Sequence, residues 1–511
     1  MKKDYVLGID IGTSATKTIL VNNAGEVIAH ASCGYPLYSP QQNWFEQDPH
    51  DWWTAVRTTI KMIIKEIPKP ENIMGIGLSG QMHGLVSLDE GREVVRPAII
   101  WSDQRNLKQC HWVYEQCGGI DGLRAYTNNR MLAGFTGGKL LWFKENEPHL
   151  YSTTKQFILP KDYIRWCLTE ELMTDVSDAS GTGLLNVCKR EWSEKLVALL
   201  NLDKSIFPKI VESQEISGYT QAKLANELGL PEGIPVMGGG GDAVLTTIGS
   251  GVIDLSTVGI SIGTGGVVAT TTTSCEENPD SILQISCHNI PGKWHKMGVA
   301  MGAGGALKWI KDLIGQAESV VTNHTNQEVY EILTREASII PPGSNGLFFL
   351  PHLYGSRCPH DDSGSKAAFI GLSSKHTKRE IIRSVLEGVV YNFREIFELV
   401  SKDPAEVDHI VLSGGGSRSN LWRQITADVL NQKVITVNTS KYGSAYGAAL
   451  IAGVGVGIWN DISEPIKNMV VESENIPLQE NHIAYNDFYV TYKNIYPSIK
   501  GIYNQQYTER S

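Results

Sequence analysis

GIDIGTSATKTIL, residues 8–20, has a counterpart about half the chain length later in SIGTGGVVATT, residues 261–271. Each stretch is an apolar β run, a tight Gly-Thr turn and a second β run, which predicts a β-hairpin. A Gly-Thr turn brings bare backbone N–H groups and a hydroxyl to one point, and this suits phosphate oxygens. Two such hairpins at matching places predict a nucleotide held between two related domains.

The first hairpin also carries a carboxylate, Asp10, at the end of its first strand. There the side chain is placed to hold the Mg²⁺ that accompanies ATP. A plain β-turn with a capping Asp is the alternative, and the second copy favours phosphate binding over it. Lys17 alternates onto one face of its strand, which favours a solvated edge charge over a catalytic one. The candidate nucleotide contacts in the two hairpins are Asp10, Gly12, Thr13, Ser14, Lys17, Gly263, Thr264 and Gly265.

The size and composition of the chain indicate a globular protein of two domains. At 511 residues it is too long for one ordinary core, so we expect two domains of roughly 250 residues each. Its 41% hydrophobic and 20% charged residues are typical of a soluble protein. The net charge of −10 argues against nucleic acid or an anionic membrane as the main partner. It does not argue against a phosphate ligand, because backbone amides and a metal bind phosphate locally.

The cysteines and the N-terminus predict a reduced, cytoplasmic protein. The 8 cysteines are scattered, with no C-x-x-C pair and no metal-ligand spacing. The first apolar run is broken by Asp10, so it does not resemble a signal peptide. No stretch approaches the ~20 apolar residues of a membrane span.

Strands and helices alternate along the chain, which predicts an α/β architecture. Strands are expected at residues 5–10, 15–21, 27–33, 73–79 (resuming at 85–88), 234–237, 409–413 and 434–437, and helices at 51–67 and 420–430. Residues 442–457 are rich in Gly and Ala, which predicts a helix packed closely on a neighbour. The seam between domains is expected between Asp242 and Ser261.

Asp242 follows four glycines, residues 238–241, and precedes a helix-like segment. A helix N-cap is the structural interpretation, since Asp is among the best capping residues. One cap does not require four glycines, however, and we expect them to let the backbone approach a ligand. A carboxylate there is placed to take the proton from a substrate hydroxyl that attacks a γ-phosphate. We favour this general-base role, which is compatible with capping.

Two loops after apolar strands are candidate substrate contacts. GQMHG, residues 80–84, ends a buried strand, a common place for ligand contacts in α/β folds, although a lone His is more often structural. In WSDQR, residues 101–105, Asp103 and Arg105 form a surface salt bridge in one interpretation. In the other, Trp101 and Asp103 meet a polyhydroxylated ligand, with the indole under an apolar sugar face. The sequence leaves both open.

Two other kinds of nucleotide site are excluded by their motifs. No segment fits the G-x-x-x-x-G-K-[ST] pattern of a P-loop. GGGSRS, residues 414–419, lacks the third glycine of a dinucleotide fingerprint.

At these residues the chain resembles the FGGY carbohydrate kinases, and among them the xylulokinases, over nearly its full length. GFTGGKLLWFKEN, residues 134–146, fits the first family signature. AAFIGL, residues 367–372, fits the second, with Glu380, Ile381, Ser384 and Glu387 downstream. Xylulokinase-like segments are residues 44–49 (WFEQDP), 80–84, 159–163 (LPKDY) and 178–182 (DASGT).

The resemblance implies two ribonuclease H-like domains of the actin and hexokinase superfamily, closing on MgATP across an interdomain cleft. Residues 1–247 would hold the sugar, the first phosphate motif and the catalytic Asp, and residues 248–511 the second phosphate motif and the adenosine motif. The implied reaction is ATP-dependent phosphorylation of a ketopentose, D-xylulose above others. A cytoplasmic enzyme is implied, and dimers are common in the family.

The resemblance also assigns roles to individual residues. Asp242 matches the catalytic base, and Met82 and His83 match the ketose-contacting pair, with Gln81, Trp101 and Asp103 beside them. Asp10 and Asp242 are the expected Mg²⁺ ligands. The adenosine motif corresponds to Gly414, Gly415, Gly416, Ser417 and Asn420.

Two departures from the xylulokinase pattern concern the acceptor. Ala243 stands where Asn usually follows the catalytic Asp, and Gly265 stands where the second hairpin usually has Ser. Losing the amide removes up to three hydrogen-bonding groups, of which one contributes ~1 kcal/mol. Another ketose, a polyol or a sugar acid is therefore the alternative acceptor.

Two alternatives come from other functional classes. One is an ATP-driven conformational machine of the actin-like superfamily, which needs no sugar pocket, so the loops at residues 80–84 and 101–105 argue against it. The other is a non-catalytic sugar sensor, against which Asp10 and Asp242 argue.

Overall fold

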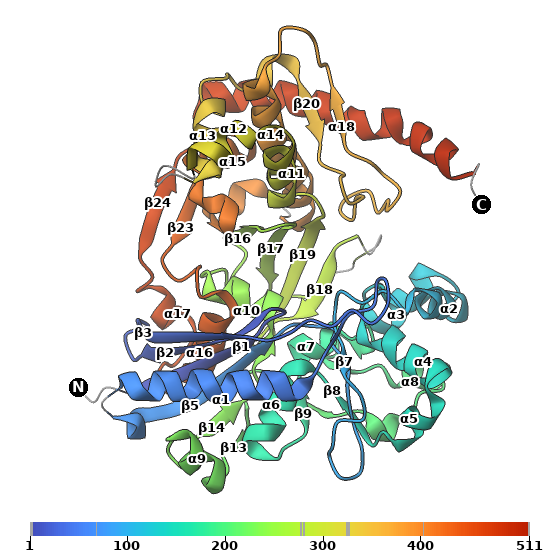
Figure 1. Ribbon diagram of the computed structural model, residues 1–511, viewed down its shortest axis with the longest axis vertical. Helices are drawn as coiled ribbons and strands as arrows, with labels where there is room; N and C mark the ends of the chain where they lie inside the picture. Colours follow the sequence, from blue (N-terminus) through green and yellow to red (C-terminus); the bar gives the residue numbers. More distant parts are fainter. Residues whose placement is uncertain are drawn as a thin grey trace. The chain divides into compact units, whose positions relative to one another are not determined.

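The computed structural model describes residues 4–67, 69–275, 278, 282–322, 328–401 and 403–508. The chain divides into two compact units. Unit 1 comprises Met1–Ile253, Thr272–His295 and Tyr442–Met469, and unit 2 comprises Asp254–Thr271, Lys296–Lys441 and Val470–Ser511. Figure 1 labels the main helices and strands of both and colours them along the sequence.

The main sheet of unit 1 is mixed. Its order is β3 (Val27–Gly34), β2 (Ala15–Asn22), β1 (Tyr5–Ile11), β5 (Ile73–Gly80), β14 (Pro235–Met237) and β13 (Ile216–Tyr219), with β15 (Gly240–Gly241) also on β5. β1, β2 and β3 form an antiparallel meander, whereas β5 runs parallel to β1 and β14 parallel to β5. The strands expected at residues 5–10, 15–21, 27–33 and 73–79 are confirmed.

A second sheet repeats this pattern. Its order is β18 (Gln284–Cys287), β19 (Trp294–Ala300), β17 (Gly266–Thr272), β16 (Thr257–Ile262), β22 (His409–Ser413), β23 (Val434–Val437) and β24 (Val471–Asn475). The β16–β17 hairpin corresponds to β1–β2, and β22 runs parallel to β16 as β5 does to β1. The two hairpins read from the sequence therefore occupy equivalent places in two α/β units.

Helices and short strands complete both units. The helices of unit 1 are α1 (Pro49–Glu66), α2 (Leu107–Cys117), α3 (Ile120–Thr127), α4 (Thr136–Asn146), α5 (Pro148–Thr153), α6 (Pro160–Thr169), α7 (Val176–Ser180), α8 (Glu194–Leu199), α9 (Ala222–Leu228), α10 (Asp242–Gly249), α16 (Gly443–Gly455) and α17 (Ser463–Ile466). Those of unit 2 are α11 (Gly304–Ile314), α12 (Gln316–Thr322), α13 (Val329–Ala337), α14 (Lys378–Val400), α15 (Asn420–Leu430) and α18 (Gln479–Thr508). The small sheets pair β4 (Glu46–Gln47) with β7 (Ala98–Ile99), β6 (Val86–Leu88) with β8 (Gln156–Ile158), β12 (Lys209–Val211) with β9 (Met173–Asp175), β10 (Leu185–Asn186) with β11 (Glu191–Trp192), and β20 (Phe348–Leu350) with β21 (Ala368–Ile370).

Helix α1, expected at residues 51–67, is confirmed but begins two residues earlier, with Asp48 as its N-cap. The side chain of Asp48 accepts a hydrogen bond from the His50 N–H at 2.9 Å. Trp52, Val56 and Ile60 are fully buried against the sheet at helical spacing. The segment at residues 85–88 is different. It does not resume β5 but forms β6, which pairs with β8 in a separate sheet, because the chain turns away through the GQMHG loop.

Helix α16 belongs to unit 1 and packs directly on its sheet. A Cβ atom added to Gly8 would lie 2.0 Å from the Ala445 carbonyl oxygen, and one on Gly77 would lie 1.9 Å from that of Ala448. Glycine is therefore required at both positions on the strands. The close packing expected of the Gly- and Ala-rich segment is confirmed.

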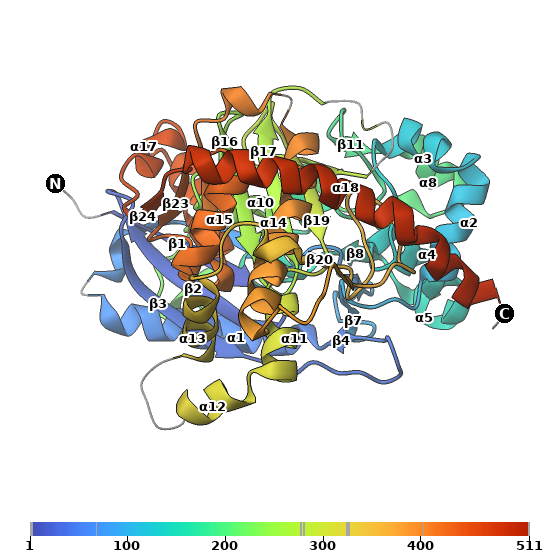
Figure 2. The ribbon, with the colours of Figure 1, turned by 90° about the horizontal axis from the view of Figure 1, so that it is seen from above.

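The long helix α18 packs along α14 and α15 within unit 2 (Figures 1 and 2). The Tyr485 hydroxyl, on α18, donates to Glu387 Oε1 of α14 at 2.9 Å, and Arg383 Nε donates to the same oxygen at 2.8 Å. These buried polar bonds fix the C-terminal helix.

The expectation of uniformly reduced cysteines is wrong for one pair. Cys188 and Cys275 form a disulfide within unit 1, across 87 positions of sequence. The prediction failed because it used sequence spacing, while the fold brings distant segments together. Among the described residues, no helix is both long and apolar enough to cross a membrane.

Candidate active site

The site of unit 1 lies at the carboxyl ends of β1 and β5. Asp10 and Ser79 are register partners on these parallel strands. The Ser79 hydroxyl donates to Asp10 Oδ1 at 2.8 Å, and the Ser444 side chain on α16 also hydrogen-bonds the carboxylate. Asp10 is only 7% exposed, and its burial raises the carboxyl pKa. The Asp10 carboxylate is thus held in place at the start of the first hairpin turn.

The first hairpin turn is held by side chains from neighbouring loops. The Tyr35 hydroxyl donates to the Gly12 carbonyl oxygen, and Gln47 Nε2 donates to the Thr13 carbonyl oxygen at 2.7 Å. Ser14 and Lys17 are exposed. Because these hydrogen bonds hold the Gly12 and Thr13 carbonyl oxygens, the turn keeps a fixed shape.

Asp242 is the first residue of α10, and Gly241, not Asp242, is the N-cap. Its carboxylate accepts hydrogen bonds from the backbone amides of Met82 and Ala243. Burial, and then repulsion by Asp10, raise the pKa of Asp242 to about 7. A carboxyl group with a pKa near neutrality takes up and releases protons readily at physiological pH.

The glycines before Asp242 are required by protein packing, which differs from the ligand approach expected from the sequence. Gly239 has φ +70°, and a Cβ there would lie 2.2 Å from the Leu78 carbonyl oxygen. A Cβ on Gly240 would lie 2.0 Å from Asn289 Nδ2, and one on Gly241 2.7 Å from the Met82 side chain. The run is clamped between neighbours and is not a flexible loop.

His83 occupies a left-handed backbone conformation, φ 69°, at the end of the GQMHG turn. Its Nδ1–H donates to the Gly181 carbonyl oxygen at 2.5 Å, which sets the ring tautomer. The ring stacks on Phe135 with centroids 4.2 Å apart and planes 9° apart. The imidazole is therefore fixed in orientation and partly exposed.

Lys139 joins the two loops expected to contact the sugar. Its fully buried Nζ donates to the His83 carbonyl oxygen at 2.7 Å and to that of Ile100, next to Trp101, at 2.8 Å. Burial lowers the Lys139 pKa to about 7. Lys139 and Phe135 lie in the first family signature, but the sequence pattern alone assigns them no role. A lysine inside an apolar helix was the available signal, because an unpaired charge is costly to bury.

Trp101 and Asp103 have different environments. Trp101 is 47% exposed, and its Nε1 donates to Thr13 Oγ1 at 2.8 Å, which joins the indole to the first hairpin. Asp103 is fully buried and accepts from Arg105 Nε at 2.9 Å and from the Phe45 amide at 2.6 Å. The Asp103–Arg105 pair therefore exists, but it is buried and not on the surface. It orders the loop that presents Trp101.

Gln81 and Met82 are buried and contact other residues of the site. Gln81 Nε2 donates to Gln47 Oε1 at 2.8 Å and to the Gly12 carbonyl oxygen at 3.4 Å, so it braces the first hairpin. Met82 is buried against Gly241. In unit 1 the structure brings Asp10, Gly12, Thr13, Gln81, Met82, His83, Trp101 and Asp242 into one neighbourhood of contacting loops.

In unit 2, the second hairpin turn adjoins the glycine loop after β22. Gly263 and Thr264 are exposed, and their carbonyl oxygens accept from the Gly304 and Gly305 amides at 2.8 and 2.9 Å. A Cβ on Gly414, which has φ +80°, would lie 2.6 Å from the carbonyl oxygen of Ile262, the residue before Gly263. The predicted phosphate and adenosine motifs of this unit are therefore side by side.

The adenosine-motif candidates form a compact turn. Gly415–Arg418 is a 3₁₀ turn, in which the Ser417 hydroxyl donates to the Gly414 carbonyl oxygen at 2.8 Å. Asn420 begins α15, and its Oδ1 accepts from Asn475 Nδ2 at 3.2 Å. A Cβ on Gly416 would lie 2.4 Å from Ile262 Cγ2, so glycine is needed for this close approach.

A magnesium site is compatible with the donors present. Within the described parts of the chain, no group of three or more His, Cys, Asp or Glu side chains could hold a metal ion. Mg²⁺ bound with a nucleotide takes one or two carboxylates, with phosphate and water oxygens completing the shell. Asp10 and Asp242, two carboxyl groups close enough for one to raise the pKa of the other, fit this requirement.

The pKa of Asp242 predicts the pH dependence of activity. If this carboxyl group acts as a general base, it works only when deprotonated, so the catalytic efficiency should rise with pH up to about 7 and then level off. A bound Mg²⁺ favours the carboxylate and should move this limb to lower pH. Initial rates between pH 5.5 and 9 at a low and a high Mg²⁺ concentration measure both effects. A profile that is flat over this whole range at the low Mg²⁺ concentration would contradict them.

Comparisons with known proteins identify the family that the sequence motifs indicate. The N-terminal domain model of the FGGY family of carbohydrate kinases matches residues 5–249, and the C-terminal domain model matches residues 258–456. The chain is 37% identical to xylulose kinase of Bacillus subtilis (strain 168) over 473 residues, 92% of each chain. It is 31% identical to gluconokinase of the same organism, covering 89% of this chain and 88% of that one.

A solved structure extends the similarity to the fold. The ligand-bound xylulose kinase from Lactobacillus acidophilus superposes with a TM-score of 0.90 at 26% identity, covering 98% of this chain and 99% of that one. The duplicated hairpins, the Asp242 carboxylate held by backbone amides and these matches all indicate the same protein family. The chain belongs to the FGGY family of carbohydrate kinases.

Proposed function

We propose that the protein transfers the γ-phosphoryl group of ATP to the terminal hydroxyl of D-xylulose and forms D-xylulose 5-phosphate. The observation that carries the proposal is Asp242, a carboxyl group with a pKa of about 7 held by the amides of Met82 and Ala243. A fixed base of this kind, beside the oriented ring of His83, is suited to activate a sugar hydroxyl. The xylulose kinase relatives, similar over nearly the whole chain, support D-xylulose as the acceptor.

Each residue contributes a defined step. His83 and Trp101 bind the ketose, the imidazole through a polar contact and the indole through an apolar sugar face, while Asp103 keeps their loop ordered. Asp242 accepts the hydroxyl proton as the oxygen attacks phosphorus and the ADP oxygen leaves. Mg²⁺ at Asp10 and Asp242 would offset phosphate charge. Thr13 and the second hairpin at Thr264 supply the amides and hydroxyls that bind phosphate oxygens.

Further expectations from the sequence are part of the same proposal. We assign sugar binding and the base to residues 1–247 and the second phosphate and adenosine motifs to residues 248–511. In addition, we propose a cytoplasmic enzyme that forms a homodimer. Sedimentation velocity would test the dimer.

The main competing acceptor is a sugar acid, since a gluconokinase is also among the relatives. Ala243, without a hydrogen-bonding side chain beside the base, is the residue most open to such a change. At Gly265 a Cβ would lie 3.1 Å from the Ala300 carbonyl oxygen, so a Ser in this hairpin requires a small shift of that neighbour.

Initial rates of ADP release decide between these acceptors. The panel is D-xylulose, L-xylulose, D- and L-ribulose, glycerol, D-gluconate and erythritol, each with MgATP. We expect the highest kcat/KM for D-xylulose. A higher value for D-gluconate would reject the proposed acceptor and keep the kinase chemistry.

Truncation of His83 should affect sugar binding more than turnover. In His83→Ala the imidazole that Gly181 and Phe135 hold in place is lost, and with it ~1–2 kcal/mol of polar contact with the ketose, so KM for D-xylulose should rise about fivefold to thirtyfold. KM for ATP should not change. Saturation curves for both substrates measure this, and an unchanged sugar KM would remove His83 from the pocket.

A further inference from the structure

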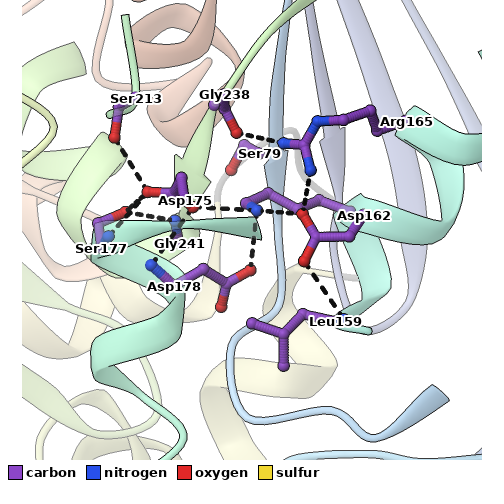
Figure 3. A network of polar contacts seen from close by, with 12 residues as sticks. Ser79, Leu159, Asp162, Arg165, Asp175, Ser177, Asp178, Ser213, Gly238 and Gly241 are labelled. Atoms are coloured by element: carbon purple, nitrogen blue, oxygen red, sulfur yellow. Dashed lines mark hydrogen bonds and ion pairs between the residues drawn. The ribbon is translucent and has the colours of Figure 1, made fainter. Parts of the chain in front are cut away.

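The glycine run at residues 238–241, which leads into Asp242, is hydrogen-bonded to a buried polar network, drawn in Figure 3. The residues of this network have no role in the proposed function described above. Its centre is Lys161 on α6, a residue without exposed surface. Lys161 Nζ lies 2.5 Å from Asp162 Oδ1, 2.9 Å from Asp175 Oδ1 and 3.5 Å from Asp178 Oδ2. Arg165 also bonds Asp162, at 2.6 Å. Two cations and three acidic side chains therefore meet in the interior of unit 1.

This network holds both ends of the glycine run. Arg165 NH2 donates to the Gly238 carbonyl oxygen at the beginning of the run. At its end, the Gly241 amide donates to Ser177 Oγ at 3.1 Å (Figure 3). Gly241 is the N-cap of α10, so its amide sets the direction in which Asp242 leaves the strand. The contact with Ser177 is thus one peptide away from the proposed base.

The Ser177 hydroxyl is itself held in one orientation. It donates to Asp175 Oδ2 at 2.6 Å and accepts from Asn289 Nδ2 at 2.8 Å. Asp175 in turn is held by Lys161 through its other oxygen. With its proton directed to Asp175, the hydroxyl oxygen presents lone pairs to the amide donors.

We propose that Ser177 is a positioning residue for phosphoryl transfer: its hydroxyl, aligned by Asp175 and Lys161, fixes the Gly241 amide and thereby the direction of the Asp242 carboxylate. This inference rests on the proposed role of Asp242 as the base. It gives a function to the family-like segments at residues 159–163 and 178–182, which contribute Lys161, Asp162 and Asp178 to the network. A base displaced by a fraction of an ångström loses alignment with the attacking hydroxyl while the substrates still bind.

The chain contains a matched control for this proposal. Ser213 is as buried as Ser177, donates to the same oxygen of Asp175 at 2.9 Å, and accepts from the same Asn289 Nδ2 at 3.0 Å. Its side chain differs in having no hydrogen bond to Gly241. Ser213→Ala and Ser177→Ala therefore remove the same contacts apart from the one at the proposed base.

The test compares steady-state kinetics of the two variants with D-xylulose and MgATP. Ser177→Ala should lower kcat about fivefold to tenfold, the scale of one lost hydrogen bond and a displaced base, with both KM values within about twofold of wild type. Ser213→Ala should keep kcat within about twofold. Ser177→Cys, whose sulfur is a weaker acceptor, should fall between wild type and Ser177→Ala. Thermal midpoints should be similar for the two alanine variants.

Each outcome bears on the proposal. Equal loss of kcat in both alanine variants, or no loss in either, would overturn it, since the Gly241 contact would then carry no specific effect. If Ser177→Ala does not fold, the comparison of Ser177→Cys with Ser213→Ala decides in the same way. Failure of the base assignment is separate, because it would show as retained turnover in Asp242→Asn.

Discussion

Replacing Asp242 by Asn should lower kcat by at least about 10²-fold, the usual scale for loss of a general base. Asn keeps the size of the side chain and an oxygen for the amides of Met82 and Ala243, but it does not take up a proton at neutral pH. The affinity for ATP, measured by isothermal titration without sugar, should stay close to that of wild type.

The stability of this variant serves as its control. Because the folded-state pKa of Asp242 is raised to about 7, the native state binds one proton more than the unfolded state between pH 3.8 and about 7. The free energy of unfolding of the wild-type protein therefore falls as pH rises through that window. Asn does not titrate there, so the variant does not lose this stability. At pH 8, Asp242→Asn should be at least as stable as wild type. Turnover within tenfold of wild type would contradict the assignment.

Replacing Lys161 by Met should destabilise the protein by about 3–5 kcal/mol, the cost of breaking a buried ion pair by removing one partner. The side chain has no exposed surface. Asp175 would lose the cation that offsets its charge, and Asp162 would keep only Arg165. Burial holds the pKa of Asp178 well above its usual value, although the nearby Lys161 acts in the opposite direction.

The matched control is a lysine in an exposed pair. Lys204 contacts Glu194 at 2.5 Å, but their side chains are 66% and 70% exposed, so Lys204→Met should cost less than about 1 kcal/mol. Urea unfolding of the two variants and wild type gives both values. A decrease of less than about 1 kcal/mol in the free energy of unfolding of Lys161→Met would contradict the prediction, because the buried carboxylates would then not depend on the Lys161 charge.

The sequence predicted the elements whose signals are local. The paired hairpins, the strand at residues 73–79, the helix expected at residues 51–67 and the close-packed α16 helix all follow from periodicity, turn residues or small side chains, and the structure confirms them. The family also followed from patterned motifs and is confirmed by the domain models.

What the sequence did not reveal depends on contacts between distant segments. The network of Lys161, Asp175 and Ser177 joins helices to a glycine run more than sixty positions away. The buried Asp103–Arg105 pair likewise depends on residue 45, which lies 58 positions before Asp103. The local sequence pattern favours a ligand-facing interpretation of the glycines at residues 238–241. It does not show that Asn289 and Leu78, which come from other parts of the chain, pack against them. The Cys188–Cys275 bond has the same origin.

The most direct measurement of the central claim is the stoichiometry and identity of the product. The enzyme is incubated with MgATP and D-xylulose, ADP is quantified, and the sugar product is examined by ³¹P NMR. We predict one D-xylulose 5-phosphate for each ADP, with ADP formation dependent on the sugar. ADP release at the same rate without sugar, or without a phosphorylated sugar, would contradict the account and favour an ATP-driven conformational machine.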